Sequence, residues 1–156
     1  MATPSPPPAR RQRHIAVLLL RLIAAAGLAV DAVVHLHLAG RYDAVGATIS
    51  QGTLFRIEAA AAGLAVLLVL LWRRRLGDLY AFAVAAGGLA LLLLYRYVDV
   101  GALGPLPDMY EPVWFTDKTL TAWAQGIAAV ALAALLVGHR GSHGQPAGRE
   151  DAPGVG

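Results

Sequence analysis

Four long apolar stretches constrain the fold of this chain more than any other feature. They are Ile15–Leu38, Leu54–Trp72, Leu79–Val98 and Leu120–Val137. Each is close to the roughly 20 residues that a helix needs to cross the hydrocarbon core of a bilayer. Only 15% of the 156 residues are charged, against about 25% in ordinary soluble domains. The sequence therefore predicts an all-α polytopic membrane protein, built as a four-helix antiparallel bundle.

The composition of the two ends separates them from this apolar region. Residues 1–13 are rich in proline and arginine, and residues 139–156 are rich in glycine and polar residues, so we expect both to be disordered tails. The membrane domain is expected over residues 14–138. Because Arg21 interrupts the first apolar stretch, we expect this stretch to remain as a span and not to be cleaved as a secretory signal. Cysteine is absent, which excludes disulfide exchange and cysteine-ligated metal clusters.

The basic residues predict the orientation of the bundle. Lysine and arginine gather on the cytoplasmic side of short connections. Arginines precede the first stretch, join the second to the third and follow the fourth, whereas the basic residues of the other two connections are balanced by acids. In a four-span chain those arginine-rich segments share one side, so we expect both termini in the cytoplasm.

Ionisable residues inside the apolar stretches are the candidate site, because such residues are costly in lipid and usually functional. Asp31 and His35 are four residues apart and share a helix face. His37 lies about 200° away from His35, so it points elsewhere. The outer halves of all four stretches contribute to one polar group. We expect these residues to form a ligand-binding pocket or a polar network: Asp31, His35, Glu58, Tyr95, Arg96, Asp99, Asp117 and Lys118.

Several pairings are expected within this group. Arg96 and Asp99 are three residues apart and can pair along one helix face. Arg96 is also a candidate to neutralise Asp31 or Glu58. His35, Asp31 and Glu58 together are a candidate metal site, in which Asp31 orients the imidazole of His35. Gln125 is expected to hydrogen-bond another helix.

Two further arginines are expected outside this group. Arg56 is expected to extend toward lipid headgroups, whereas Glu58 lies deeper. Arg21 stands apart, and either extends toward the cytoplasm or continues the polar stripe of its helix.

The connection Asp99–Asp117 is rich in glycine and proline, which favours turns over a helix. It also carries apolar and aromatic residues, so we expect it to fold back onto the bundle or the membrane interface. Two interpretations stay open. The segment either anchors the helices at the interface or covers a site that faces outward.

Four segments carry a resemblance to known proteins: residues 31–58, Tyr95–Gly101, Gly104–Pro107 and Trp114–Lys118. They look like the polar outer rim of small four-span membrane proteins of high-GC bacteria. The layout of residues 14–138 resembles that of DoxX-like four-helix proteins. The resemblance implies a location in the bacterial inner membrane. It carries no diagnostic motif, so it assigns no site residue.

The function we expect is the binding of a small ligand, a proton or a metal ion in the polar pocket. One alternative is a structural or accessory subunit whose buried charges only fix helix packing. Another is a quinone-linked redox enzyme, although the sequence favours a protein without catalytic activity and names no cofactor. The expected partner is the lipid bilayer, with a homo-oligomer or a larger membrane complex as further alternatives. No partnership with nucleic acid is expected, since topology accounts for the net charge of +3.

Overall fold

The computed structural model describes residues 8–46 and 48–141, and it contains four long helices. All four are long and apolar enough to cross a membrane, which confirms the predicted all-helical fold with four candidate spans. A short 3-10 turn named η1 extends the first helix, and a π-helical turn named η2 extends the second. The bounds are α1 Pro8–Ala39, η1 Gly40–Tyr42, α2 Gln51–Leu67, η2 Leu68–Trp72, α3 Arg75–Tyr97 and α4 Thr116–Gly141.

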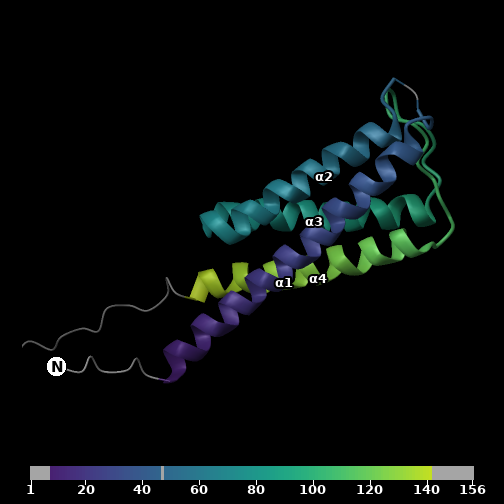
Figure 1. Cartoon of the computed structure of the whole chain (residues 1–156). Coiled ribbons are helices and arrows are strands. Elements are labelled where there is room, and N and C mark those ends of the chain that lie inside the picture. The colour runs from purple at the N-terminus through teal and green to yellow at the C-terminus, as the bar shows by residue number, and fades with distance from the viewer. Residues whose placement is uncertain (1–7, 47, 142–156) are drawn as a thin grey trace, which may run out of the picture.

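The helices form an antiparallel bundle in which α1 packs against α2 and α4, and α3 packs against α4 and α2. Figure 1 shows both longer connections at one end, which we name the loop end: residues 40–46, 48–50 and 98–115. The start of α1, the turn after η2 and the end of α4 lie at the opposite end, which we name the turn end. The α2–α3 contact is the least extensive of the four, and these two helices diverge toward the loop end (Figure 1).

The core of the bundle is made largely of small side chains, among them Ala24, Ala62 and Ala128, each fully buried. Small residues let helix backbones approach closely, which is how helices pack in lipid. At Gly27 an added Cβ would lie only 2.6 Å from the carbonyl oxygen of Ala124, so α1 and α4 touch there through backbone. Large apolar side chains are instead exposed on the outside of every helix.

The helix boundaries differ from those expected at both ends of the chain. Residues 8–13 were expected to be disordered, but α1 begins at Pro8. Proline fits the first turn of a helix, where its missing N–H has no partner to lose, and the arginines that follow are good helix formers. Likewise α4 continues through residues 139–141. The rest of the two expected tails lies outside the described residues.

Three helices begin a turn earlier than the apolar pattern indicated: α2 at Gln51, α3 at Arg75 and α4 at Thr116. Polar residues occupy these first turns, so hydropathy alone misses them. At α2 the reason is visible, because the side-chain oxygen of Ser50 accepts a hydrogen bond from the backbone N–H of Thr53 at 3.1 Å. Such a cap satisfies a donor that the helix itself leaves free.

Candidate functional site

A cavity of about 350 Å³ lies at the loop end, among α1, α2, α3, the start of α4 and the segment 98–115. Most of its lining is apolar, including Leu54, Phe55 and Leu92. The polar residues of the lining are His35, Tyr42, Gln51, Glu58, Tyr95, Glu111, Lys118 and Thr121. A concave, mainly apolar pocket with a few polar groups is the usual form of a small-molecule site.

The cavity is open to the side of the bundle between α2 and α3. Ile57 of α2 and Leu91 of α3 both line it, yet they remain 59% and 54% exposed. These two residues therefore face the cavity and the outside at once.

The deep side of the cavity is formed by a polar cluster on three helices. Asp31 is fully buried, and its Oδ1 accepts hydrogen bonds from His35 Nδ1 at 2.9 Å and Gln125 Nε2 at 2.9 Å. The Asp31–His35 pairing predicted from their spacing is thus confirmed, as is the interhelical bond expected of Gln125. His35 Nδ1 also lies 3.0 Å from the backbone oxygen of Asp31. His35 itself lines the cavity.

Gly88 of α3 is what lets the side chains of α2 and α4 meet at this depth. An added Cβ would collide with Gln125 Nε2 and lie 2.9 Å from Glu58 Oε1. The absence of a side chain at Gly88 therefore leaves room for both groups against the backbone of α3. Glu58, which was expected to be the deeper of the two charges on its helix, lines the cavity at this point.

Three oxygens of this cluster are buried without a hydrogen-bond partner among the described residues: Asp31 Oδ2, Glu58 Oε1 and Gln125 Oε1. Buried polar atoms are paired in the great majority of cases, and each unpaired one costs about 1–3 kcal/mol. All three are acceptors. Of the three residues, Glu58 lines the cavity, so a group that brings N–H or O–H donors into it would satisfy Glu58 Oε1.

The segment 98–115 covers the cavity from the loop end. The backbone N–H of Glu111 bonds to the carbonyl of Tyr95 at 3.0 Å, and Tyr42 donates its hydroxyl to Glu111 Oε2 at 3.0 Å. Lys118 Nζ donates to the carbonyl oxygens of Glu111 at 2.6 Å and Val113 at 3.4 Å. Besides Glu111, three apolar side chains of this cover line the cavity: Leu106, Met109 and Phe115. The expectation that the segment folds back onto the bundle is therefore correct.

Of the eight candidate site residues, the structure brings His35, Glu58, Tyr95 and Lys118 to the cavity and places Asp31 behind His35. Arg96, Asp99 and Asp117 do not line it. Arg96 lies over the rings of Tyr97 and Trp114, at 4.9 and 5.5 Å. It makes no ion pair with Asp31 or Glu58 among the described residues.

The expected Arg96–Asp99 pair is also absent from the described residues, because α3 ends at Tyr97 and the spacing rule for a helix face no longer applies. Asp99 accepts a hydrogen bond from the backbone N–H of Gly101 at 3.1 Å instead. Asp117 lies 4.0 Å from Arg41 at the surface.

The expected metal site does not form. In residues 8–46 and 48–141, no group of three His, Asp or Glu side chains is placed to hold a metal ion. The contact between Asp31 Oδ1 and His35 Nδ1 that this site required is present at 2.9 Å, but the three side chains do not form such a group with Glu58.

Two neighbouring residues, His37 and Arg56, do not line the cavity. His37 is exposed and contacts Arg41 at 3.1 Å, as its position on the helix predicts. Arg56, expected to extend toward lipid headgroups, makes two hydrogen bonds to the Asp43 carboxylate at 2.6 and 2.7 Å, which hold the pKa of Asp43 below its usual range.

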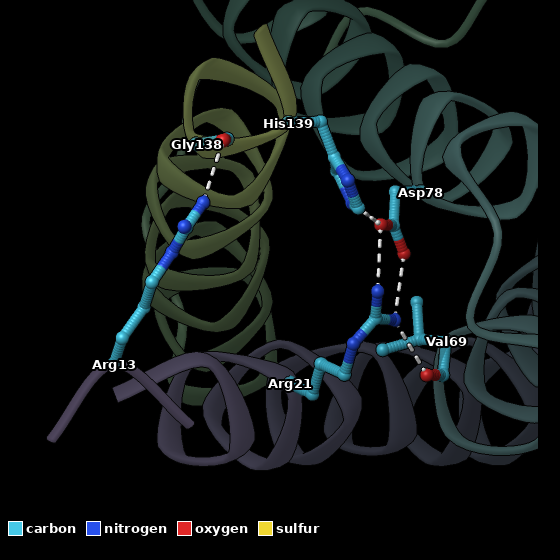
Figure 2. A network of polar contacts seen from close by, with 6 residues as sticks. All are labelled: Arg13, Arg21, Val69, Asp78, Gly138 and His139. Carbon is cyan, nitrogen blue, oxygen red and sulfur yellow. Dashed lines mark hydrogen bonds and ion pairs between the residues drawn. The ribbon is translucent and has the colours of Figure 1, made fainter. Parts of the chain in front are cut away.

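A second polar network lies at the turn end, and the sequence interpretation missed it (Figure 2). Arg21 is 3% exposed and makes two hydrogen bonds to fully buried Asp78, at 2.8 and 2.9 Å. His139 Nε2 lies 3.1 Å from the same carboxylate. The two expectations for Arg21, extension to the cytoplasm or continuation of the stripe, were therefore wrong. Its charge is neutralised within the bundle by α3.

The π-helical turn η2 completes this second network. Arg73 N–H bonds to the carbonyl of Leu68, five residues back, at 3.0 Å. In a regular α-helix it would bond to Val69. The Val69 carbonyl accepts from Arg21 at 2.8 Å instead (Figure 2). The wide turn ends at Arg73, whose φ of 50° is left-handed.

One signal in the sequence points to a residue that was missed. Asp78 is the acid that stands at the turn end next to an apolar run, so it is the natural partner of a buried arginine there. Glu111 gave no such signal, because its place depends on how a loop without periodicity folds.

Comparison with protein-family models, characterised proteins and solved structures finds no match to this chain. The resemblance to DoxX-like proteins therefore stays an expectation based on layout.

Proposed function

We propose that this chain is an integral membrane protein that binds a small, largely apolar molecule in the cavity at the loop end. The observation that carries the proposal is a cavity of about 350 Å³ whose lining includes Glu58, with a buried Oε1 that has no partner among the described residues. The apolar lining provides most of the contact with such a molecule. The cluster of Glu58, His35 and Asp31 provides the polar group that fixes its orientation.

The outer surface of the bundle supports its placement in a membrane. Large apolar side chains are exposed on every helix, for example Val33, Leu71 and Trp123 at 66%, 76% and 69%. Soluble monomers rarely expose contiguous apolar patches beyond a few hundred Å². The arginines near the turn end favour a cytoplasmic location for that end. The cavity would then lie in the extracytoplasmic half of a bacterial inner membrane.

The contrast between the two polar networks favours binding over a purely structural role at the loop end. At the turn end, both oxygens of Asp78 are bonded, which is the pattern of charges that fix helix packing. At the loop end, one oxygen each of Asp31, Glu58 and Gln125 has no partner among the described residues, and Glu58 lines the cavity. A network that served packing alone would gain by closing around these oxygens.

Photolabelling with a small apolar probe tests this proposal. The full chain in phosphatidylcholine nanodiscs is irradiated with 3-trifluoromethyl-3-phenyldiazirine, and the labelled residues are located by mass spectrometry. We expect label at Leu92, Met109 and Phe115, which line the cavity. Lipid-dissolved probe should also label Val130, which is 72% exposed on α4 and serves as the internal reference.

Cavity-filling variants provide the control. Leu54→Trp on α2 and Leu92→Trp on α3 place bulk in the cavity from separate helices. Each should abolish label at Met109 and Phe115 while Val130 keeps its label. If wild-type protein is labelled at Val130 but not at Met109 or Phe115, the cavity does not admit small apolar molecules and the proposal fails.

A further inference from the structure

The polar cluster of the cavity has more acceptors than donors. The donor at Gln125 Nε2 and the ring nitrogen His35 Nδ1 both bond to Asp31 Oδ1. Lys118 Nζ, at the mouth, bonds to the backbone carbonyls of Glu111 and Val113. None of these donors bonds to Glu58 in the described part of the chain, and Glu58 Oε1 has no partner there.

The cluster of Asp31, Glu58 and His35 also carries more negative than positive charge. With both carboxylates of Asp31 and Glu58 ionised, a protonated His35 compensates only one of them, and the other cation of the lining, Lys118, is matched by the Glu111 carboxylate. Arg96 lies over aromatic rings outside the cavity lining, and Arg21 is bonded to Asp78 at the other end of the bundle. A buried charge without a counter-charge is expensive. A cation in the cavity would remove that cost.

We propose that the cavity takes a lipophilic amine, a molecule with an apolar body and a cationic head that carries N–H donors, with the head against Glu58. This inference rests on the proposed binding function and names its ligand class. An ammonium with at least one N–H supplies both the charge and the hydrogen bond that Glu58 Oε1 lacks. A quaternary ammonium would supply only the charge.

The position of the cluster fits such a molecule. Glu58 lies seven residues into α2, which is about 10 Å along the helix at its rise per residue. The wall around it is apolar, including Leu54, Leu92 and Phe115. Because Ile57 and Leu91 line the cavity and remain exposed, an amine dissolved in the bilayer reaches it from the side, between α2 and α3.

A series of compounds that share one apolar body and differ in the polar head group tests the proposal. 4-Phenylbutylamine, 4-phenylbutanol and 4-phenylbutyrate are titrated calorimetrically into the full chain in phosphatidylcholine nanodiscs, with empty discs as the baseline. We expect the amine to bind at least about tenfold more tightly than the alcohol or the acid, as a hydrogen bond to a charged group predicts. The N,N,N-trimethyl form of the amine should bind more weakly than the amine itself.

Glu58→Gln should abolish the preference for the amine. The matched control is Asp99→Asn, which removes a carboxylate at the same end of the bundle but outside the cavity lining, and it should leave the preference unchanged. A second pair of variants tests the proposal whether or not Glu58→Gln folds. Gly88→Ala should displace Glu58 and Gln125 and weaken amine binding, whereas Gly87→Ala, with nothing within 4 Å of its added Cβ, should not.

The outcomes separate this inference from the proposed function. Equal binding of all three heads, or tightest binding of the acid, overturns the amine assignment while the cavity remains a binding site. A preference for the amine that persists in Glu58→Gln also overturns it. If none of the compounds binds and the diazirine labels no cavity residue, the proposed function fails with it.

An amine head can belong to a free molecule or to a lipid such as phosphatidylethanolamine. Repeating the titration in discs that contain this lipid distinguishes the two sources. If the lipid competes, the affinity for 4-phenylbutylamine falls and the headgroup occupies the site. If the affinity is unchanged, the site selects the free amine.

Discussion

Arg21 and Asp78 neutralise each other where neither is in contact with water. Both are at least 97% buried, and their two hydrogen bonds are 2.8 and 2.9 Å long. Exposed Arg56 and Asp43 form a pair of similar geometry at the loop end. Burial therefore distinguishes the two pairs. Removing one member of a buried pair leaves an uncompensated charge, whereas an exposed pair is solvated either way.

We therefore predict that Asp78→Asn destabilises the protein strongly, by about 3–5 kcal/mol, as is typical when one partner of a buried pair is removed. The double variant Arg21→Met with Asp78→Leu should cost much less than the sum of the single changes. Thermal unfolding in detergent measures both effects. Asp43→Asn is the control and should have little effect. If Asp78→Asn melts like Asp43→Asn, the turn-end pair does not hold the bundle together.

At the scale of elements, glycines decide how closely the helices meet. Gly52, in the first turn of α2, faces the end of α1, and an added Cβ would collide with the carbonyl oxygen of Ala39 and with Asp43 Oδ1. Gly63, further along the same helix, has nothing within 4 Å of its added Cβ. The two positions share a helix but differ in what they contact.

Gly52→Ala should destabilise the bundle, by about 1–3 kcal/mol as overpacking usually does. Ala39 contributes backbone there, which cannot move aside as a flexible side chain would. Gly63→Ala should be neutral or stabilising by up to about 1 kcal/mol, because alanine favours a helix more than glycine does. Melting temperatures of the two variants, measured side by side, test the contrast. Equal melting temperatures would mean that α1 and α2 do not meet as closely as described.

Local sequence patterns predicted some of these elements and contacts. Contacts between residues far apart in the sequence were not predicted. The four spans follow from length and hydropathy, and the Asp31–His35 bond follows from a spacing of four within one helix. The starts of α2, α3 and α4 were placed too late because polar first turns carry no apolar signal. Asp78 and Glu111 were missed because their roles depend on helix packing and on loop folding, which periodicity does not encode.

At the scale of the whole molecule, the two ends of the bundle differ in their polar chemistry. The turn end is held by the closed network of Arg21, Asp78 and His139 (Figure 2). The loop end holds a cavity lined by Glu58, whose Oε1 has no partner among the described residues. Between them lie apolar residues such as Ala24, Leu28 and Leu132, so no polar side chains connect the two networks through this part of the core. The bundle therefore has a cavity at one end and a buried ion-pair network at the other.

The proposed orientation predicts which end is accessible from outside the cell. Since the chain has no cysteine of its own, a maleimide reacts in each variant only with the cysteine that was introduced. Thr48→Cys at the loop end should react with a membrane-impermeant maleimide on intact cells. Gln12→Cys at the turn end should react only after permeabilisation, because the basic end faces the cytoplasm. The reverse pattern would contradict the orientation.

The most direct test of the central claim is the reactivity of a cysteine at Leu92, inside the cavity, toward charged methanethiosulfonates. Ethylammonium and ethylsulfonate reagents are compared, each normalised to its rate with a free thiol. We predict that Leu92→Cys reacts faster with the cation by about tenfold, as charge focusing in a cleft allows. Glu58→Gln should remove that difference, and Val130→Cys on the outer face of α4 should react slowly with both. If Leu92→Cys reacts no faster than Val130→Cys, or prefers the anion, the loop end holds no accessible cavity of the kind described.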